Sequence, residues 1–183
     1  MCPGWVRVRT SDSYAPVSSL GHEVMLWAEG GNNVIASIKK RDKCSENGFH
    51  GILIRAGTLG NERDVVVSSR QKILFEGWPL ELHFGELRAL VPVQSLVNNY
   101  NILIHTEPTD WYSVAPKTLS AIFVEGIPFE AGGKVSGSLS VPPDGLGKLV
   151  TGETLVLDDD EAVLMQGMLF PSLENRSLRR RVF

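Results

Sequence analysis

The sequence predicts an all-β protein, or a β-dominated α+β protein: an antiparallel sandwich or barrel of about ten short strands with at most short helices. Apolar residues recur in short stretches, many of which alternate with polar residues as the two faces of a strand require. Turn signals rich in glycine, proline and asparagine separate these stretches. No segment shows a helical apolar period over three turns. Together these observations favour layered sheets over packed helices.

Residues 64–93 hold the densest apolar sequence and are expected to form the spine of the core. Strands are predicted over residues 65–67, 73–75 and 78–84. The last of these alternates cleanly, with Glu81 and His83 on the face expected to meet solvent. Its predicted buried face consists of Trp78, Leu80, Leu82 and Phe84. Burying such side chains contributes about 1.5–3 kcal/mol each before entropy is counted.

The remaining strands are predicted, in chain order, over residues 5–9, 23–28, 34–38, 49–56, 102–105, 119–125, 134–141 and 148–157. The first alternates apolar with basic residues, which is typical of a sheet edge. The second and third flank a Gly-Gly-Asn-Asn turn at residues 30–33 and are therefore expected to pair as a hairpin. A proline- and glycine-rich turn at residues 142–147 joins the last two.

Five segments between the strands have their own predictions. Residues 11–21 and the charged residues 39–43 are expected to be loops. Residues 86–90 are expected to form one helical turn that Pro92 stops. Residues 107–110 are expected to be a loop, and residues 107–117 are the best candidate for a linker. The acidic residues 158–161 are either a solvated loop or the negative start of a short helix.

Length and composition are those of one ordinary globular domain. The chain has 183 residues, 43% of them hydrophobic and 21% charged, so a single β-rich domain over residues 1–183 with a short basic tail at about 175–183 is expected. Its two cysteines, Cys2 and Cys44, suggest neither a disulfide framework nor a zinc site. Without a secretory signal or a membrane-length apolar run, the expected location is cytoplasmic, or the virion for a viral component.

No motif with recognisable chemistry stands out. There is no glycine-flanked nucleophilic serine, no phosphate-binding loop and no pair of metal ligands at regular spacing, so no catalytic residue, metal or cofactor is assigned. A dispersed catalytic site would escape such a search. In that case His83, His105 and Asp110 are the first candidates.

The C-terminal tail is the most distinctive patch of the sequence. Its expected partner-binding residues are Arg176, Leu178, Arg179, Arg180, Arg181 and Phe183. Apolar side chains in this tail would fill pockets on a neighbour while the arginines pair with carboxylates or phosphates. The acidic residues 158–161, in the same or an adjacent copy, are one candidate mate. A plain solvated basic tail is the alternative.

These observations favour a non-enzymatic structural or assembly protein, such as a virus or phage particle component. Its expected partner is itself, as a homo-oligomer, or another structural protein. The net charge of −3 argues against nucleic-acid partners, apart from local contacts through the C-terminal arginines. Without a membrane-length apolar run, no membrane partner is expected. A β-sandwich module that binds a ligand or a partner is one alternative. An enzyme with a dispersed site around His83, His105 and Asp110 is the other.

Overall fold

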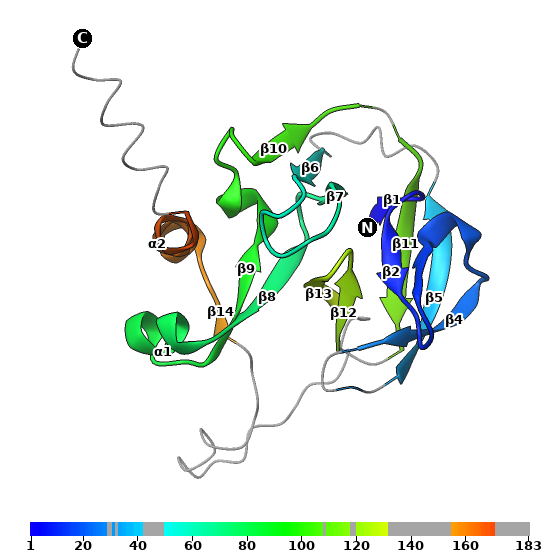
Figure 1. Ribbon diagram of the computed structural model, residues 1–183, viewed down its shortest axis with the longest axis horizontal. Coiled ribbons are helices and arrows are strands. Elements are labelled where there is room, and N and C mark those ends of the chain that lie inside the picture. The colour runs from blue at the N-terminus through cyan, green and yellow to red at the C-terminus, as the bar shows by residue number, and fades with distance from the viewer. Residues whose placement is uncertain are drawn as a thin grey trace, which may run out of the picture.

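The computed structural model describes residues 1–28, 31, 33–41, 50–107, 109–117, 120–131 and 155–170, and the account below concerns these residues. They form three largely antiparallel sheets and two short helices (Figure 1). The prediction of a strand-dominated, antiparallel fold is confirmed. The predicted strand over residues 134–141, the turn after it and most of the returning strand lie outside the described residues.

A four-stranded sheet has the order β1-β11-β5-β4. Its strands are β1 (Cys2–Pro3), β4 (Glu23–Trp27), β5 (Asn33–Arg41) and β11 (Trp111–Pro116). The predicted β4–β5 hairpin is confirmed. The charged loop predicted at residues 39–43 is wrong for its first three residues, because Lys39, Lys40 and Arg41 continue β5 and pair with β11. The predicted linker at residues 107–117 is also wrong, since β11 lies between two strands of this sheet.

A seven-stranded sheet has the order β14-β9-β8-β13-β12-β2-β3. Its strands are β2 (Arg7–Arg9), β3 (Tyr14–Pro16), β8 (Lys72–Glu76), β9 (Arg88–Pro92), β12 (Ser120–Val124), β13 (Ile127–Ala131) and β14 (Leu155–Val156). Among the strands of the described residues, only the short β14 runs parallel to its neighbour, β9. β2 is covered by β3 and so is not the predicted edge strand. β9 replaces the helical turn predicted at residues 86–90, because those residues complete a ladder with β8.

A three-stranded sheet has the order β10-β6-β7, with β6 at Gly51–Ile54, β7 at Val65–Ser68 and β10 at Ile102–His105. It approaches the four-stranded sheet closely at Gly51. A Cβ atom added there would lie 2.9 Å from Val66 Cγ1 and 3.2 Å from the Trp111 ring, which belongs to β11. The two sheets therefore meet at a position with no room for a side chain.

The predicted strand at residues 78–84 is a helix, α1 (Trp78–Phe84). Pro79 lies in the first turn, where its missing N–H costs nothing, and Gly85 ends the helix in the left-handed conformation at φ 73°. Leu80 is buried, whereas Trp78 is 71% and Leu82 is 68% exposed. The alternation predicted the wrong element because residues four apart share a face in a helix as well as in a strand.

The second helix is α2 (Asp159–Leu169), so the acidic segment at residues 158–161 starts a helix and is not a loop. Asp158 and Glu161 form a capping box: the Asp158 carboxylate accepts from the Glu161 N–H at 2.9 Å, and the Glu161 carboxylate accepts from the Asp158 N–H at 3.0 Å. Gln166 fastens the helix to the short 3₁₀ turn Val93–Leu96 by donating to the carbonyls of Leu96 and Val97.

All three sheets and α2 contribute to one buried cluster of apolar side chains. Its fully buried members include Val8, Leu26, Ile52, Ile73, Phe129 and Ala162. Along the described ranges, no helix has the length and apolar character needed to cross a membrane.

The close approach at Gly51 makes a testable prediction. Gly51→Ala is expected to lower the free energy of unfolding by about 1–3 kcal/mol, because the new methyl group overlaps Val66 and Trp111. Gly21→Ala is the matched control, since the nearest atom there would lie 3.8 Å away. Chemical denaturation of both variants measures the difference. Equal stabilities would contradict the close contact between the two sheets.

Candidate functional site

The residues proposed for a dispersed catalytic site do not come together. His83 lies exposed on α1, while His105 ends β10 in the three-stranded sheet, and Figure 1 shows these two elements well apart. Asp110 pairs with Lys40 at 2.7 Å on the surface of the four-stranded sheet. In the residues with a described position, no three His, Cys, Asp or Glu side chains are grouped as metal ligands.

The partner-binding residues predicted in the C-terminal tail lie outside the described residues. Their role stays a prediction. Two other polar clusters emerge from the fold instead. One surrounds Arg7 and Glu125, and the other surrounds the N-terminal peptide at Met1 and Cys2.

The first cluster is built on the tight turn between β12 and β13. Val124 pairs with Ile127, so Glu125 and Gly126 form a two-residue hairpin loop. Both have positive φ, 49° and 93°, as hairpin turns matching the strand twist require. Glycine adopts this conformation freely, but Glu125 does so only against steric resistance. Contacts of its side chain must therefore hold Glu125 in place.

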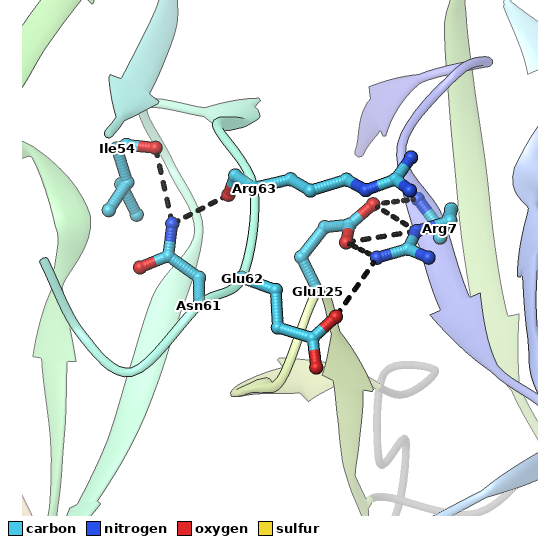
Figure 2. Close-up of polar contacts among 6 residues, drawn as sticks. All are labelled: Arg7, Ile54, Asn61, Glu62, Arg63 and Glu125. Carbon is cyan, nitrogen blue, oxygen red and sulfur yellow. Dashed lines mark hydrogen bonds and ion pairs between the residues drawn. The ribbon is translucent and has the colours of Figure 1, made fainter. Parts of the chain in front are cut away.

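Those contacts come from Arg7 at the start of β2 (Figure 2). The Glu125 carboxylate accepts from the Arg7 backbone N–H at 3.0 Å, from its Nε at 3.0 and 3.1 Å, and from its second guanidinium nitrogen at 2.6 Å. The Glu125 N–H donates in turn to the Arg7 carbonyl. Because the carboxylate is only 2% exposed, this forked geometry offsets its loss of hydration. Hydrogen bonding to Glu125 raises the pKa of Arg7 above its ordinary value.

The loop between β6 and β7 completes the cluster. Glu62 reaches the Arg7 guanidinium at 3.7 Å (Figure 2). Asn61 is buried, and its amide donates to the carbonyls of Arg55 and Arg63 at 3.0 and 2.7 Å. A Cβ atom on Gly126 would lie 3.6 Å from the carbonyl oxygen of Gly60, so the hairpin turn rests directly on this loop. The cluster ties three segments together and leaves no reactive group open.

The second cluster holds the peptide between Met1 and Cys2. The turn Ser68–Gln71, which links β7 to β8, makes two hydrogen bonds with Met1. The Ser68 N–H donates to the Met1 carbonyl at 2.9 Å, and the Met1 nitrogen donates to Gln71 Oε1 at 3.1 Å. Cys2 itself pairs with Tyr112 of β11. The residues on both sides of this peptide bond are thus held by backbone or side-chain contacts.

Gln71 is oriented by two further contacts. Its Nε2 donates to the carbonyl of Glu130 in β13, so Oε1 is the atom turned toward Met1. Its backbone carbonyl accepts from the Val93 N–H at 2.9 Å. A side chain fixed at both ends places an acceptor at one location with little entropy left to lose.

Cys2 is a free thiol and is 4% exposed. Burial raises its pKa from 9.0 to about 11, so the thiol is neutral at physiological pH. The Cys2 sulfur lies four covalent bonds from the Met1 carbonyl carbon, and the carbonyl oxygen already accepts one backbone N–H. The arrangement suits attack of the thiol on its own upstream peptide bond.

Sequence reasoning missed both clusters. Glu125-Gly126 between two apolar runs is a hairpin signal of the Asp-Gly kind, but the alternation of residues 119–125 predicts only the end of a strand there. Nothing in the sequence pairs Arg7 with a residue so far along the chain. Cys2 carried no signal beyond its place near the start, because its importance depends on the distant turn at residues 68–71.

Comparison with known proteins identifies the fold family. Residues 6–133 match the family model of the Hint domain, and this is more than half of the chain. The protein belongs to the Hint domain family. Two crystal structures of the MchDnaB-1 intein are similar in fold at 9% identity, with TM-scores of 0.47 and 0.46; they cover 73% and 72% of this chain, which spans all of each. No curated protein matches the sequence.

The family corrects the function predicted from the sequence. A structural or assembly protein, such as a self-associating virus or phage component, is wrong because residues 6–133 form a Hint domain. The binding-module and dispersed-enzyme alternatives did not anticipate this family either. The structural-protein prediction rested on the absence of short catalytic motifs. Such motifs consist of side chains close in sequence, whereas both clusters here join residues more than sixty positions apart.

The buried ion pair makes a second prediction. Arg7→Met is expected to lower the free energy of unfolding by about 3–5 kcal/mol, because it leaves the Glu125 carboxylate buried without its partner. Asp110→Asn is the control, since it breaks an ion pair whose side chains are more than half exposed and is expected to cost under about 1 kcal/mol. Urea unfolding of both variants tests this. Similar losses in the two variants would contradict a structural role specific to Arg7.

A third prediction concerns Cys2. Its folded pKa of about 11 lies above its ordinary value of 9.0, so its contribution to stability is complete below pH 9 and is lost as pH rises toward 11. The stability advantage of the natural chain over Cys2→Ala is therefore expected to shrink by up to about 2–3 kcal/mol across that window. Denaturation from pH 8 to 11 measures it. Parallel pH profiles for the two chains would show that the thiol is not buried.

Proposed function

We propose that this chain is an autoprocessing Hint module that rearranges the peptide bond before Cys2. The observation that carries the proposal is the clamp on that bond, made by the Ser68 N–H and the Gln71 amide. Membership of the Hint family supports it, although the family match begins at residue 6 and does not itself include Cys2.

The chemistry is an acyl shift from nitrogen to sulfur. The Cys2 thiol attacks the Met1 carbonyl carbon through a five-membered ring, and the C–N bond breaks as the C–S bond forms. The thiol proton passes to the departing nitrogen of Cys2, so atoms and charges balance. The Ser68 N–H faces the oxygen on which negative charge develops, which is where a fixed donor lowers the barrier.

Gln71 acts as a positioning residue. It touches the Met1 nitrogen, one residue upstream of the breaking bond, and is itself held by Glu130 and Val93. Restricting rotation of Met1 keeps the carbonyl carbon within reach of the thiol. The neutral state of the thiol limits the rate at neutral pH, because the thiolate is the stronger nucleophile.

The proposal is tested on the chain with a reporter peptide joined to the Met1 nitrogen. Hydroxylamine, which cleaves thioesters, is expected to release a fragment ending at Met1, and the release should accelerate as pH rises from 7 toward 10. Gln71→Leu is expected to slow release by about tenfold to a hundredfold. Mass spectrometry identifies the cut and its rate.

Two cysteine variants make the test specific. Cys2→Ala should abolish release, while Cys44→Ala, which removes the other thiol of the chain, should leave it unchanged. Release from Cys2→Ala at the natural rate would overturn the assignment of Cys2. Absence of any release from the natural chain at pH 10 would overturn the proposed processing itself.

A further inference from the structure

α1 turns an apolar and acidic face to solvent. Trp78, Glu81 and Leu82 lie three and four residues apart, so they share one side of the helix. Trp78 is 71% and Leu82 is 68% exposed, the largest values among the exposed large apolar residues. The opposite side packs inward through Leu80. Folding of this seven-residue helix does not by itself explain why its largest aromatic side chain faces solvent.

The segment after α1 extends this face. The Gly77 N–H donates to the carbonyl of Leu87 at 3.0 Å, which places Leu87 beside the start of the helix. Leu87 is 57% exposed, and its neighbour Glu86 is exposed as well. The surface made of Trp78, Glu81, Leu82, Glu86 and Leu87 is called the α1 face below.

The carboxylates of the α1 face are available for a cation. In the described part of the chain, Glu81 and Glu86 form no ion pair, whereas nearby Glu76 is paired with Arg88 at 2.7 Å. The other acidic candidate, at the start of α2, is already engaged, because Asp158 and Glu161 bond each other's backbone in the capping box. The α1 face therefore offers a cationic segment two exposed carboxylates beside exposed apolar side chains.

One segment of this chain has the matching chemistry. Residues 176–183 read Arg-Ser-Leu-Arg-Arg-Arg-Val-Phe, with four arginines among leucine, valine and phenylalanine. Guanidinium groups pair with carboxylates in forked geometry, and the apolar side chains suit an exposed tryptophan and leucines. We propose that residues 176–183 dock on the α1 face of the same molecule, with the arginines on Glu81 and Glu86 and the apolar side chains on Trp78, Leu82 and Leu87.

The chain is long enough for this contact. α2 is fastened at Gln166 to the carbonyls of Leu96 and Val97, while α1 lies at the other end of β9, near Arg88. Five strand residues and a 3₁₀ turn separate these two points, about 25 Å. From Phe170, nine residues of extended chain reach about 30 Å and so bring Arg179 to the α1 face. Figure 1 shows α1 and α2 flanking the same side of the seven-stranded sheet.

Trp78 supplies the signal for the test. The difference between the emission spectra of the natural chain and Trp78→Phe reports Trp78 alone, although the chain has four tryptophans. Removing residues 176–183 is expected to shift that signal to longer wavelength and to make it more accessible to acrylamide. Adding a synthetic peptide of residues 174–183 to the shortened chain should reverse both changes.

Charge reversal tests the ionic contacts in the full chain. Glu81→Lys with Glu86→Lys is expected to weaken docking about tenfold and to expose Trp78, and reversing Arg179, Arg180 and Arg181 to glutamate in the same chain should restore the natural signal. Asp12→Lys with Glu107→Lys, which changes the net charge equally at exposed sites elsewhere, should have no effect.

Three results would overturn the proposal. The first is an unchanged Trp78 signal on truncation, and the second is a double reversal that behaves like its control. The third is a signal that depends on protein concentration together with dimers in sedimentation, which would place the tail on a second copy. Because the reversal variants keep the full chain, poor folding of the truncated protein does not remove the test.

Discussion

The Arg7–Glu125 pair is the constraint on which the arrangement of the sheets depends. A carboxylate that is 2% exposed is stable only where a cation and several N–H groups meet it, and Arg7 supplies all of them. Glu125 also has a positive φ in a two-residue turn, so its backbone conformation and its side-chain contacts together define the position of this turn. The loop carrying Asn61 and Glu62 packs against this turn and pairs with Arg7. The contacts of Arg7 therefore join β2, the β12–β13 hairpin and the β6–β7 loop.

The same hairpin connects this unit to the N-terminal peptide. Glu125 anchors its turn, while near the other end of β13 the carbonyl of Glu130 orients Gln71, which holds Met1. Ser68 and Gln71 belong to the short turn between β7, which is buried throughout, and β8, so the contacts on the Met1–Cys2 peptide come from the ends of two strands rather than from a long loop. The proposed intramolecular attack requires that the bond be held in one position, and support from strands and their connecting turn favours this.

Much of the fold was predictable because strand alternation and turn chemistry are local. The β4–β5 hairpin followed from its glycine- and asparagine-rich turn, and β7, β8, β10 and β12 followed from their apolar stretches. The prediction is wrong at residues 78–84, where seven residues fit both periods and only Pro79 and the glycines at each end favour a helix. It failed again at β11, whose polar neighbours resemble a linker although β5 and β1 enclose the strand. None of the residues of the N-terminal site was predicted, because each acquires its role from a partner in another strand.

By itself, the sequence determined that this protein is built from short antiparallel strands, since that follows from the period of its side chains and the residues at its turns. Tertiary structure alone decided that Arg7 meets Glu125 and that Gln71 meets Met1. Such pairings depend on which strands become neighbours, and strand order is a property of the packed core rather than of any local pattern. The chemistry proposed for Cys2 depends on that packing, because burial sets the protonation of its thiol and a distant turn holds the bond it would attack.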